Sequence, residues 1–367
     1  MNIIYKILLL SLLFLPGAYA THLMGGEIRA VHISGQTFRI SVHVYLDLVN
    51  GSNAADVMQT VNVCFGDGST SELPRSNTTR LPDFPAAVAI FEKTYTFSSS
   101  GKFQISASVS SRSPYLNLPN AISENLFLWT VIDTYSPNNS PILPYPLIAA
   151  GVKQVFAIDL KPLVADNDSI SISLQTVSKP SPGTCGVRSL QTSFFYPNDL
   201  TKNGTFKVDS KNKKLVWNAP ELAGNYVYAF IVNEWRDGII ISQSYHEGTI
   251  VVTDRSGEAV SIPQYEPAGA FITSVPISTL ASPEISMKLD AYPIPTEDIL
   301  NFKVYSKKRS NIKVQLINLQ GKVLKEISSK EQAILFEEAF DIHILSKGIY
   351  ILKASNELES VSQKIIR

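Results

Sequence analysis

Cysteine is nearly absent from the sequence. Only Cys64 and Cys185 occur, and they lie far apart in the chain. A single pair is not a disulfide framework, and without a C-x-x-C motif we expect no structural zinc site. We therefore predict two unpaired, partly buried thiols in preference to one bridge between domains.

The sequence also lacks an excess of either charge. Its 32 basic residues balance 32 acidic ones, and charged residues make up 17% of the chain. This balance does not favour a polyanionic partner, and the short basic run Lys307-Lys308-Arg309 is typical of a solvated hairpin tip. No nucleic-acid partner is predicted.

The familiar motifs of catalysis are missing as well. The sequence has no G-x-S-x-G elbow, H-E-x-x-H helix or Walker loop. Its histidines are scattered: His22, His32, His43, His246 and His343. These absences argue against the commoner hydrolases and metalloproteases, so we predict a protein that is not an enzyme and has no catalytic residue. A triad assembled from distant strands stays open, because such sites are recognised by geometry.

Long apolar runs are confined to the start. Lys6 supplies a charge, Ile7 to Leu15 form an apolar stretch, and the next five residues end in an A-x-A pattern at Ala20. This order predicts a secretory signal peptide at residues 1–20. A membrane anchor is the alternative, but the stretch is shorter than the roughly 20 residues that a span needs. We expect an exported protein, either attached to the cell surface or secreted.

The residues that are abundant favour strands. The sequence contains 15 Tyr, 17 Phe, 21 Pro and 19 Gly, which suit short strands joined by tight turns. Its 367 residues exceed one ordinary domain, so we expect two or three folding units. Apolar and polar residues alternate between Phe38 and Leu46, which predicts a strand with one solvated face and with His43 pointing outward. We predict an all-β protein.

The first unit, residues 21–136, contains a G-D-G turn between two alternating strands. Phe65-Gly66-Asp67-Gly68, Tyr95, and Gly101 with Phe103 resemble the polycystic kidney disease (PKD) repeat, an extracellular immunoglobulin-like module. Cys64 stands where that repeat usually has a polar residue, and Val63 where it has an aromatic one. The resemblance implies an immunoglobulin-type sandwich, in which Asp67 shapes the turn rather than binding a ligand.

The second unit, residues 137–254, follows the turn-forming segment 136–141. Asp166-Asn167-Asp168, the Trp217 strand with Pro220, and Gly224-Asn225-Tyr226 resemble a cadherin-like repeat. Together with the residues up to Val252 they are similar to a domain common in surface proteins of the Bacteroidetes, some connected with gliding. The resemblance implies a second immunoglobulin-type sandwich.

Two sets of residues in the second unit are candidates for binding. The oxygens of Asp166 and Asp168 suit Ca²⁺, although we expect a solvated acidic turn there, because the further ligands of a calcium site are not evident. Trp235 and Arg236 lie among charges at the end of an apolar strand and are possible recognition residues. The other two tryptophans, Trp129 and Trp217, are expected in the core.

Residues 255–285 are rich in Pro, Ser and Ala and are expected to form an exposed linker. The residues after it, 286–367, resemble the C-terminal type A sorting domain (Por secretion tail) of type IX secretion system cargo from the Bacteroidetes. The residues that carry this resemblance, and that would form the sorting signal, are Tyr292, Pro293, Pro295, Gly321, Lys322, Gly348, Ile349, Tyr350, Lys364 and Ile365. Ile294 stands where Asn is usual, and His343 interrupts a run that is usually short.

This resemblance implies a docked final strand that the type IX translocon recognises. We expect Ile349, Ile351 and Ile365 to tie that strand to the core, at roughly 1.5 to 3 kcal/mol for each buried side chain. It also implies removal of the tail by a cell-surface sortase, with attachment to a surface lipopolysaccharide or release.

The predicted architecture is two tandem immunoglobulin-like sandwiches followed by a C-terminal β-sandwich sorting domain. The predicted function is adhesion, binding or spacing, with an unknown extracellular protein or glycan as partner and no cofactor apart from a possible Ca²⁺. A secreted hydrolase with a non-obvious site, or a component of a structural surface filament, are the alternatives.

Overall fold

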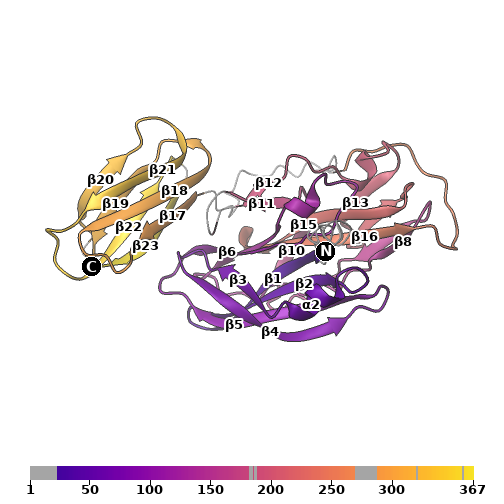
Figure 1. Ribbon diagram of the computed structural model, residues 1–367, viewed down its shortest axis with the longest axis horizontal. Helices are drawn as coiled ribbons and strands as arrows, with labels where there is room; N and C mark the ends of the chain where they lie inside the picture. The colour runs from indigo at the N-terminus through magenta and orange to yellow at the C-terminus, as the bar shows by residue number, and fades with distance from the viewer. Residues whose placement is uncertain (1–22, 182–184, 186–187, 269–286, 320, 358) are drawn as a thin grey trace, which may run out of the picture.

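The computed structural model describes residues 23–181, 185, 188–268, 287–319, 321–357 and 359–367, and its regular elements are nearly all strands (Figure 1). The predicted all-β class is confirmed. None of the helices in these ranges is long and apolar enough to cross a membrane. The signal peptide predicted at residues 1–20 lies outside the described residues, as does much of the linker predicted at 255–285.

Residues 23–268, which we call the N-terminal module, contain most of the strands. The first strands are β1 (Leu23–Ser34), β2 (Thr37–Asp47), β3 (Thr60–Cys64), β4 (Thr70–Arg80), β5 (Ala86–Thr96), β6 (Lys102–Val109), β7 (Leu126–Asp133) and β8 (Ala149–Gly151). The next are β9 (Phe156–Asp159), β10 (Ser169–Gln175), β11 (Ser178–Pro180), β12 (Arg188–Leu190), β13 (Thr205–Asp209), β14 (Lys214–Asn218), β15 (Gly224–Arg236) and β16 (Ile239–Thr253). The helices are α2 (Ser52–Val57), η1 (Ala121–Ser123) and η2 (Pro197–Asp199).

The strand pairings of this module close into a ring. Strands β1, β2, β5, β4, β3, β6, β7 and β16 pair in that order, and β16 pairs again with β1 through Glu27 and His246. The largest cluster of buried apolar side chains draws on all these strands, for example Ile28 of β1, Leu128 of β7 and Tyr245 of β16. Strands β15 and β10 extend the sheet beyond β16.

The first and second predicted sandwiches therefore share a core. The expected boundary between residues 136 and 137 does not separate two clusters, because β16 contacts β7 and β1 directly. The turn-rich segment after β7, which we call the strap (residues 134–148), is held against β1 rather than exposed. Ser140 N donates to Ala30 O, and Ala30 N donates to Ser140 Oγ, each at 2.9 Å.

A second core lies on the other face of β15 and β16. It is covered by the three-stranded sheet β13-β14-β9. Trp217 of β14 is 2% exposed there and contacts Phe206 and Tyr226 edge to face, and Phe230 is also buried. Trp129 of β7 is buried in the ring core. The prediction that Trp129 and Trp217 are core residues is confirmed.

The two cysteines form a disulfide, so the prediction of unpaired thiols is wrong. Cys64 at the end of β3 is bonded to Cys185, which precedes β12, across a sequence separation of 121. Spacing in the sequence did not reveal this pair, because the ring brings the Phe65–Gly68 turn and the β11–β12 hairpin together. The bond therefore joins the first predicted unit to the second.

The remaining residues, 287–367, which we call the tail, form a separate sandwich. One sheet contains β17 (Met287–Tyr292), β18 (Ile299–Ser310) and β21 (Ala333–Asp341). The other, in the order β20-β19-β22-β23, contains β20 (Val323–Ser328), β19 (Lys313–Asn318), β22 (Ile349–Ser355) and β23 (Ser360–Ile366). Its core cluster consists of tail residues alone, from Met287 to Ile365. Figure 1 shows this sandwich in orange and yellow.

We predict that Trp217→Ala lowers the free energy of unfolding of the N-terminal module by about 3 to 5 kcal/mol, because it leaves a cavity that two aromatic neighbours cannot fill. Chemical denaturation followed by fluorescence measures this. Trp235→Ala, at a half-buried ring, is the control and should cost about 1 kcal/mol. Equal losses for both variants would contradict the burial of Trp217.

We also predict that replacing both cysteines by serine destabilises the module by about 2 to 5 kcal/mol, because the cross-link restricts a long loop of the unfolded chain. Denaturation with and without reductant measures the difference, and the double variant should be insensitive to reductant. Two titratable thiols in the denatured, unreduced wild type would show that the bond does not form.

Candidate functional site

The residues that resemble a sorting signal gather at one end of the tail sandwich. The turn after β19, the segment before β22 and the end of β23 meet there, because Asn318 pairs with Tyr350 and Tyr350 pairs with Ile365. Residues 293–298 join this end through Thr296, whose N–H donates to Ile366 O at 2.9 Å. We call this region the sorting end. The structure thus brings together residues that lie more than one strand apart in the sequence.

Arg367 is fixed at the sorting end by its backbone and its side chain. Gly348 N donates to Arg367 O at 2.9 Å, and Arg367 N donates to Gly348 O at 3.0 Å. The guanidinium donates to three backbone carbonyls, those of Glu297 (2.8 Å), His343 (2.8 Å) and Leu345. Backbone carbonyls can accept every hydrogen bond that a guanidinium donates, without a buried counter-ion. We call these three side-chain bonds the Arg367 clamp, and they join the end of β23 to the loops before β18 and before β22.

The buried positions of β22 and β23 differ in part from the prediction. Ile365 is fully buried, as expected. Ile349 is 40% exposed and Ile351 is half-buried, so the expectation that they tie the strand to the core is wrong. The alternation of β22 has the opposite phase: Tyr350 and Leu352 face the core. The apolar run Ile349-Tyr350-Ile351-Leu352 carries no alternation from which the face could be predicted.

The other predicted signal residues lie in turns around the same end. Gly321 has φ +81°, a conformation that favours glycine, and Lys322 N donates to the Asn318 side chain at 2.9 Å. Tyr292, 45% exposed, ends β17, and the exposed Pro293 and Pro295 follow it before the buried Thr296. Lys364 is exposed on β23.

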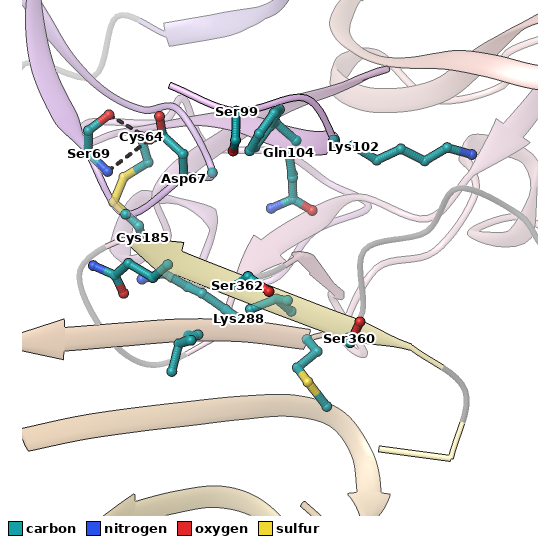
Figure 2. Close-up of a pocket in the computed structure, with 18 of the residues that line it drawn as sticks. Cys64, Asp67, Ser69, Ser99, Lys102, Gln104, Cys185, Lys288, Ser360 and Ser362 are labelled. Carbon is teal, nitrogen blue, oxygen red and sulfur yellow. Dashed lines mark hydrogen bonds between the residues drawn. A yellow bond between two sulfur atoms is a disulfide. The ribbon is translucent and has the colours of Figure 1, made fainter. Parts of the chain in front are cut away.

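A cavity of about 490 Å³ lies beside the Phe65–Gly68 turn (Figure 2). Asp67 forms this turn as predicted: its carboxylate accepts from Ser69 N at 3.0 Å and from Tyr95 Oη at 2.6 Å, while Tyr95 stacks on Phe65. The disulfide and residues 99–104 line the cavity on the same side, and β17 and β23 line it on the other. The polar part of the lining consists of serine hydroxyls, glutamine amides, two lysines and the carboxylates of Asp67 and Glu359.

The candidate calcium residues are bonded to protein groups. Asp168 accepts two hydrogen bonds from Arg236, at 2.9 and 2.7 Å. Asp166 accepts from the backbone N–H of Asn139 at 2.7 Å and from its side chain. Among the described residues, no group of three or more His, Cys, Asp or Glu side chains is arranged to hold a metal ion. Asp166 therefore ties the strap to the turn before β10.

The two candidate recognition residues belong to the same cluster. Arg236 is engaged by Asp168, and Trp235 is half-buried with its Nε1 donating to Ser171 Oγ at 2.9 Å. Neither side chain is presented freely to solvent. The sequence identified this cluster of polar residues but assigned its members to separate roles.

Glu234, the residue before Trp235, was not predicted. It is fully buried, and its Oε2 accepts hydrogen bonds from Asn138 Nδ2 at 2.6 Å and from Ser242 Oγ. Its Oε1 has no partner within the described part of the chain. Burial raises the pKa of Glu234 to about 7, and the nearby carboxylates of Asp168 and Asp166 add to the effect.

A buried network crosses the ring at β1 and β16. Glu27 lies between Arg29, which donates to it, and His246, whose Nδ1 is 2.7 Å from Glu27 Oε2. Burial raises the pKa of Glu27, but Arg29 and His246 outweigh it and hold that pKa well below its usual range. Glu27 and Arg29, opposite charges two residues apart and therefore on one face of a strand, are the signal in the sequence that could have identified this residue.

His43 joins the same network, so the prediction that it points outward is wrong. It is 5% exposed and pairs with Glu27 across β1 and β2. Burial lowers its pKa to about 4. The face predicted to be solvated is covered by the strap, whose Pro144 and Pro146 line a small cavity with Tyr45 and His246.

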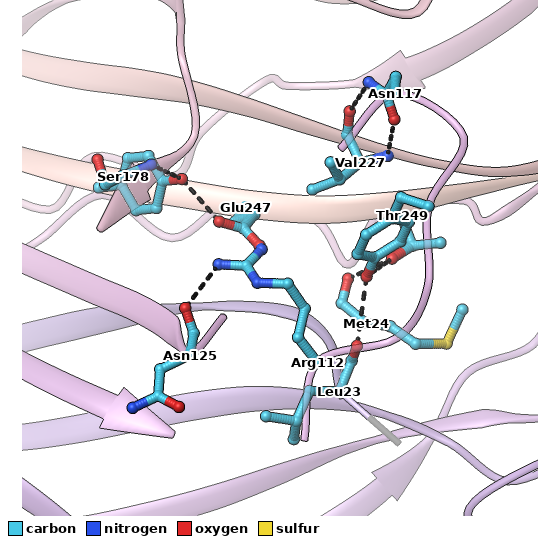
Figure 3. A network of polar contacts seen from close by, with 11 residues as sticks. Leu23, Met24, Arg112, Asn117, Asn125, Ser178, Val227, Glu247 and Thr249 are labelled. Carbon is cyan, nitrogen blue, oxygen red and sulfur yellow. Dashed lines mark hydrogen bonds and ion pairs between the residues drawn. The ribbon is translucent and has the colours of Figure 1, made fainter. Parts of the chain in front are cut away.

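A second buried network lies on the opposite face of β16 (Figure 3). Arg112 forms an ion pair with Glu247, and Glu247 accepts a hydrogen bond from Tyr245 Oη at 2.7 Å. Beside it, Thr249 Oγ1 donates to Met24 O at 2.7 Å. Asn117 bonds both backbone groups of Val227, at 2.8 and 2.9 Å. These polar groups bind the ring strands and loops to one another, and none of them lines the cavity beside the Phe65–Gly68 turn.

Comparison with known protein families identifies the tail. Residues 290–367 match the family described as "Secretion system C-terminal sorting domain". The family match does not extend to the N-terminal module, and no curated protein matches the chain. The tail therefore indicates a protein that the type IX secretion system exports to the cell surface or beyond.

Two solved structures are similar over most of the chain but only weakly. Dimeric latent PorU from Porphyromonas gingivalis is 12% identical with a TM-score of 0.23, and the match covers 94% of this chain. This chain spans about a third (34%) of that PorU chain. The BSP domain of a biofilm associated protein is 10% identical with a TM-score of 0.19, covering 94% of this chain and 81% of that one. Neither likeness supports an assignment of function.

We predict that Glu234→Gln stabilises the N-terminal module at pH 8 by up to about 3 kcal/mol and changes it little at pH 4. The folded-state pKa of Glu234, about 7, lies above its unfolded value, so ionisation opposes folding. Wild-type stability from this residue is complete below pH 4.5 and is lost as the pH rises toward 7. A glutamine oxygen can still accept from Asn138 and Ser242.

Denaturation midpoints of the two proteins across this pH range measure the difference. His43 contributes the opposite slope, since its lowered pKa makes stability fall as the pH drops from about 6.5 toward 4. That contribution is common to both proteins and cancels in their difference. An equal stability difference at pH 4 and pH 8 would contradict the raised pKa of Glu234.

Proposed function

We propose that the protein is a non-catalytic surface or secreted protein, in which residues 21–254 bind or space an extracellular partner and the tail directs export. The observation that carries the proposal is the sorting end, where the signal-like residues and β23 form one ordered surface. The matched family supports the export route. The rest of the proposal is supported by the architecture of the N-terminal module.

The acid–base groups of that module support a non-catalytic role. Glu27, His43 and His246 are buried together, and Arg112 and Glu247 form a second buried group. Groups that are bonded to one another inside a core stabilise a fold but do not meet a substrate. The PKD-like Asp67 turn and the cadherin-like Asp168 turn likewise use their carboxylates within the protein. We propose an extracellular protein or a glycan as the partner.

In this proposal residues 1–20 are removed at the inner membrane, the module and the tail fold in the periplasm, and the type IX translocon recognises the folded tail. A cell-surface sortase then cuts within the Pro/Ser-rich linker predicted at residues 255–285, because linkers are common sites of proteolytic cleavage. The mature product begins at Thr21 and is attached to a surface lipopolysaccharide or released.

We predict that a fluorescent protein fused to residues 1–20 and 255–367 is exported by a host that has the type IX system. Removing Lys364 to Arg367 should leave the full-length protein in the periplasm, because both strand pairing at Gly348 and the Arg367 clamp are lost. Its N-terminal module should remain folded, since the tail has its own core. Fractionation and protease protection measure both outcomes.

A periplasmic fusion, in a host that exports an established cargo tail, would contradict the export proposal. Incubation of residues 21–254 with panels of glycans and proteins tests the binding role separately. Binding without turnover is expected, and conversion of any panel member to product would favour the secreted-hydrolase alternative.

A further inference from the structure

Strand β23 is an edge strand, and no described strand pairs with the side that faces away from β22. It is last in the sheet order β20-β19-β22-β23, and β22 is its sole ladder partner among the strands of residues 287–367. An edge strand presents a row of backbone N–H and C=O groups that can pair with another extended chain.

The register shows which residues of β23 present those groups. Gly348 and Arg367 exchange both hydrogen bonds, so bonded pairs recur at every second residue toward β22. Ile365, Gln363 and Val361 are therefore bonded to β22, whereas the backbone groups of Lys364, Ser362 and Ser360 point away from it. Ile366 O, which also points away, accepts from Thr296 N, as this alternation requires.

The other edge strands of the tail carry more charged residues than β23 does. β20 carries Lys325 and Glu326, and β21 carries Glu337 and Glu338. β17 carries a Lys288–Asp290 ion pair at 2.6 Å, and its Ala291 N–H is occupied by the Gln363 side chain. Charged residues on an edge oppose strand addition. The outward positions of β23 hold two serines and a single charge, Lys364.

Space is available beside this edge. Ser360, Ser362 and Gln363 line the cavity of about 490 Å³, and Figure 2 shows the two serines on the strand that borders it. The cavity is comparable in volume to sites that hold small ligands, so it can receive a few residues of extended chain. Small hydroxyl side chains at its rim leave the backbone of β23 accessible.

We infer that β23 is recognised by strand addition, with an extended segment of the export machinery pairing with the backbone groups of Ser360, Ser362 and Lys364. A strand is the ligand whose donors and acceptors match an alternating row of backbone groups. The Arg367 clamp fixes the position of β23 relative to the sorting end, so the edge and that surface are presented together. This inference rests on the proposed role of the tail in export.

The test is Ser362→Pro in the full-length protein. Proline lacks an N–H and its ring projects toward the free side, so it blocks an added strand, while Ser362 N–H makes no bond to β22 that could be lost. We expect the exported fraction to fall at least about tenfold, equivalent to about 1.4 kcal/mol of binding free energy. Cell fractionation with quantitative blotting measures it.

Glu326→Pro is the matched control on the opposite edge of the same sheet. Ser329 N donates to Ile312 O, so alternation makes the N–H of Glu326 point away from β19. This variant should be exported like the wild type. Normal melting of both purified variants confirms that the tail still folds. If Ser362→Pro does not fold, the pair Ser360→Lys with Ser362→Lys replaces it, because lysines hinder edge pairing without altering the backbone.

The outcomes separate this inference from the proposed function. Export of a folded Ser362→Pro protein, or of the folded double-lysine protein, at the wild-type level would overturn strand addition while leaving the sorting role intact. Failure of the wild-type tail to direct export would overturn the proposed function itself. A dimer of the wild type that Ser362→Pro dissociates would show that the edge binds a second copy of this chain, and would also overturn the inference.

Discussion

The N-terminal module depends on the position of β1, which must pair with β2 on one side and with β16 on the other. Two adjacent glycines make this possible. A side chain on Gly25, which has φ +132°, would place its Cβ 2.1 Å from Glu247 O, and one on Gly26 would come within 2.3 Å of His43 O. Glu27, the next residue, is then buried against Arg29 and His246. Close backbone approach and a satisfied buried charge together close the ring.

The tail depends on a comparable constraint at its C-terminal end, where β23 must be attached to the rest of the sandwich. β23 adds few buried apolar groups, Ile365 being the main one, and backbone bonds at Gly348 with the Arg367 clamp complete its attachment. Apolar burial orders the strand without selecting one register along its length, whereas three carbonyl partners around one guanidinium have a fixed geometry. In both the module and the tail, a nonpolar core supplies most of the packing, and a few hydrogen bonds and ion pairs fix the position of one strand.

Several features could be predicted from the sequence because their causes are local. The Asp67 turn follows from glycine and aspartate side by side, and the strands follow from alternation and composition. Trp217 was identifiable as a core residue because one large aromatic ring per sandwich is usually buried. The tail was identifiable because its motifs follow in a set order, and the family match confirms it.

Other features were not predictable because they depend on contacts between distant segments. His43 alternates with apolar residues as a solvated side chain would, but it is buried beside Glu27. The strap, which lies against Tyr45 on this face, comes about a hundred residues later in the chain. Cys64 and Cys185 are adjacent through the ring. Asp168 and Arg236, which were assigned to a metal and to a partner, are bonded to each other because β10 pairs with β15. In each case the sequence indicated the type of side chain but not the distant residue that contacts it in the fold.

The closure of the ring by β1 and β16 also determines when the module can fold. β1 pairs with residues 246 and 247, so the ring core cannot be completed until almost the whole module has been synthesised. Contacts between residues so far apart in sequence form slowly, because a long loop must be closed before they contribute. A chain made from its N-terminus therefore leaves one side of β1 without its partner strand until β16 is available.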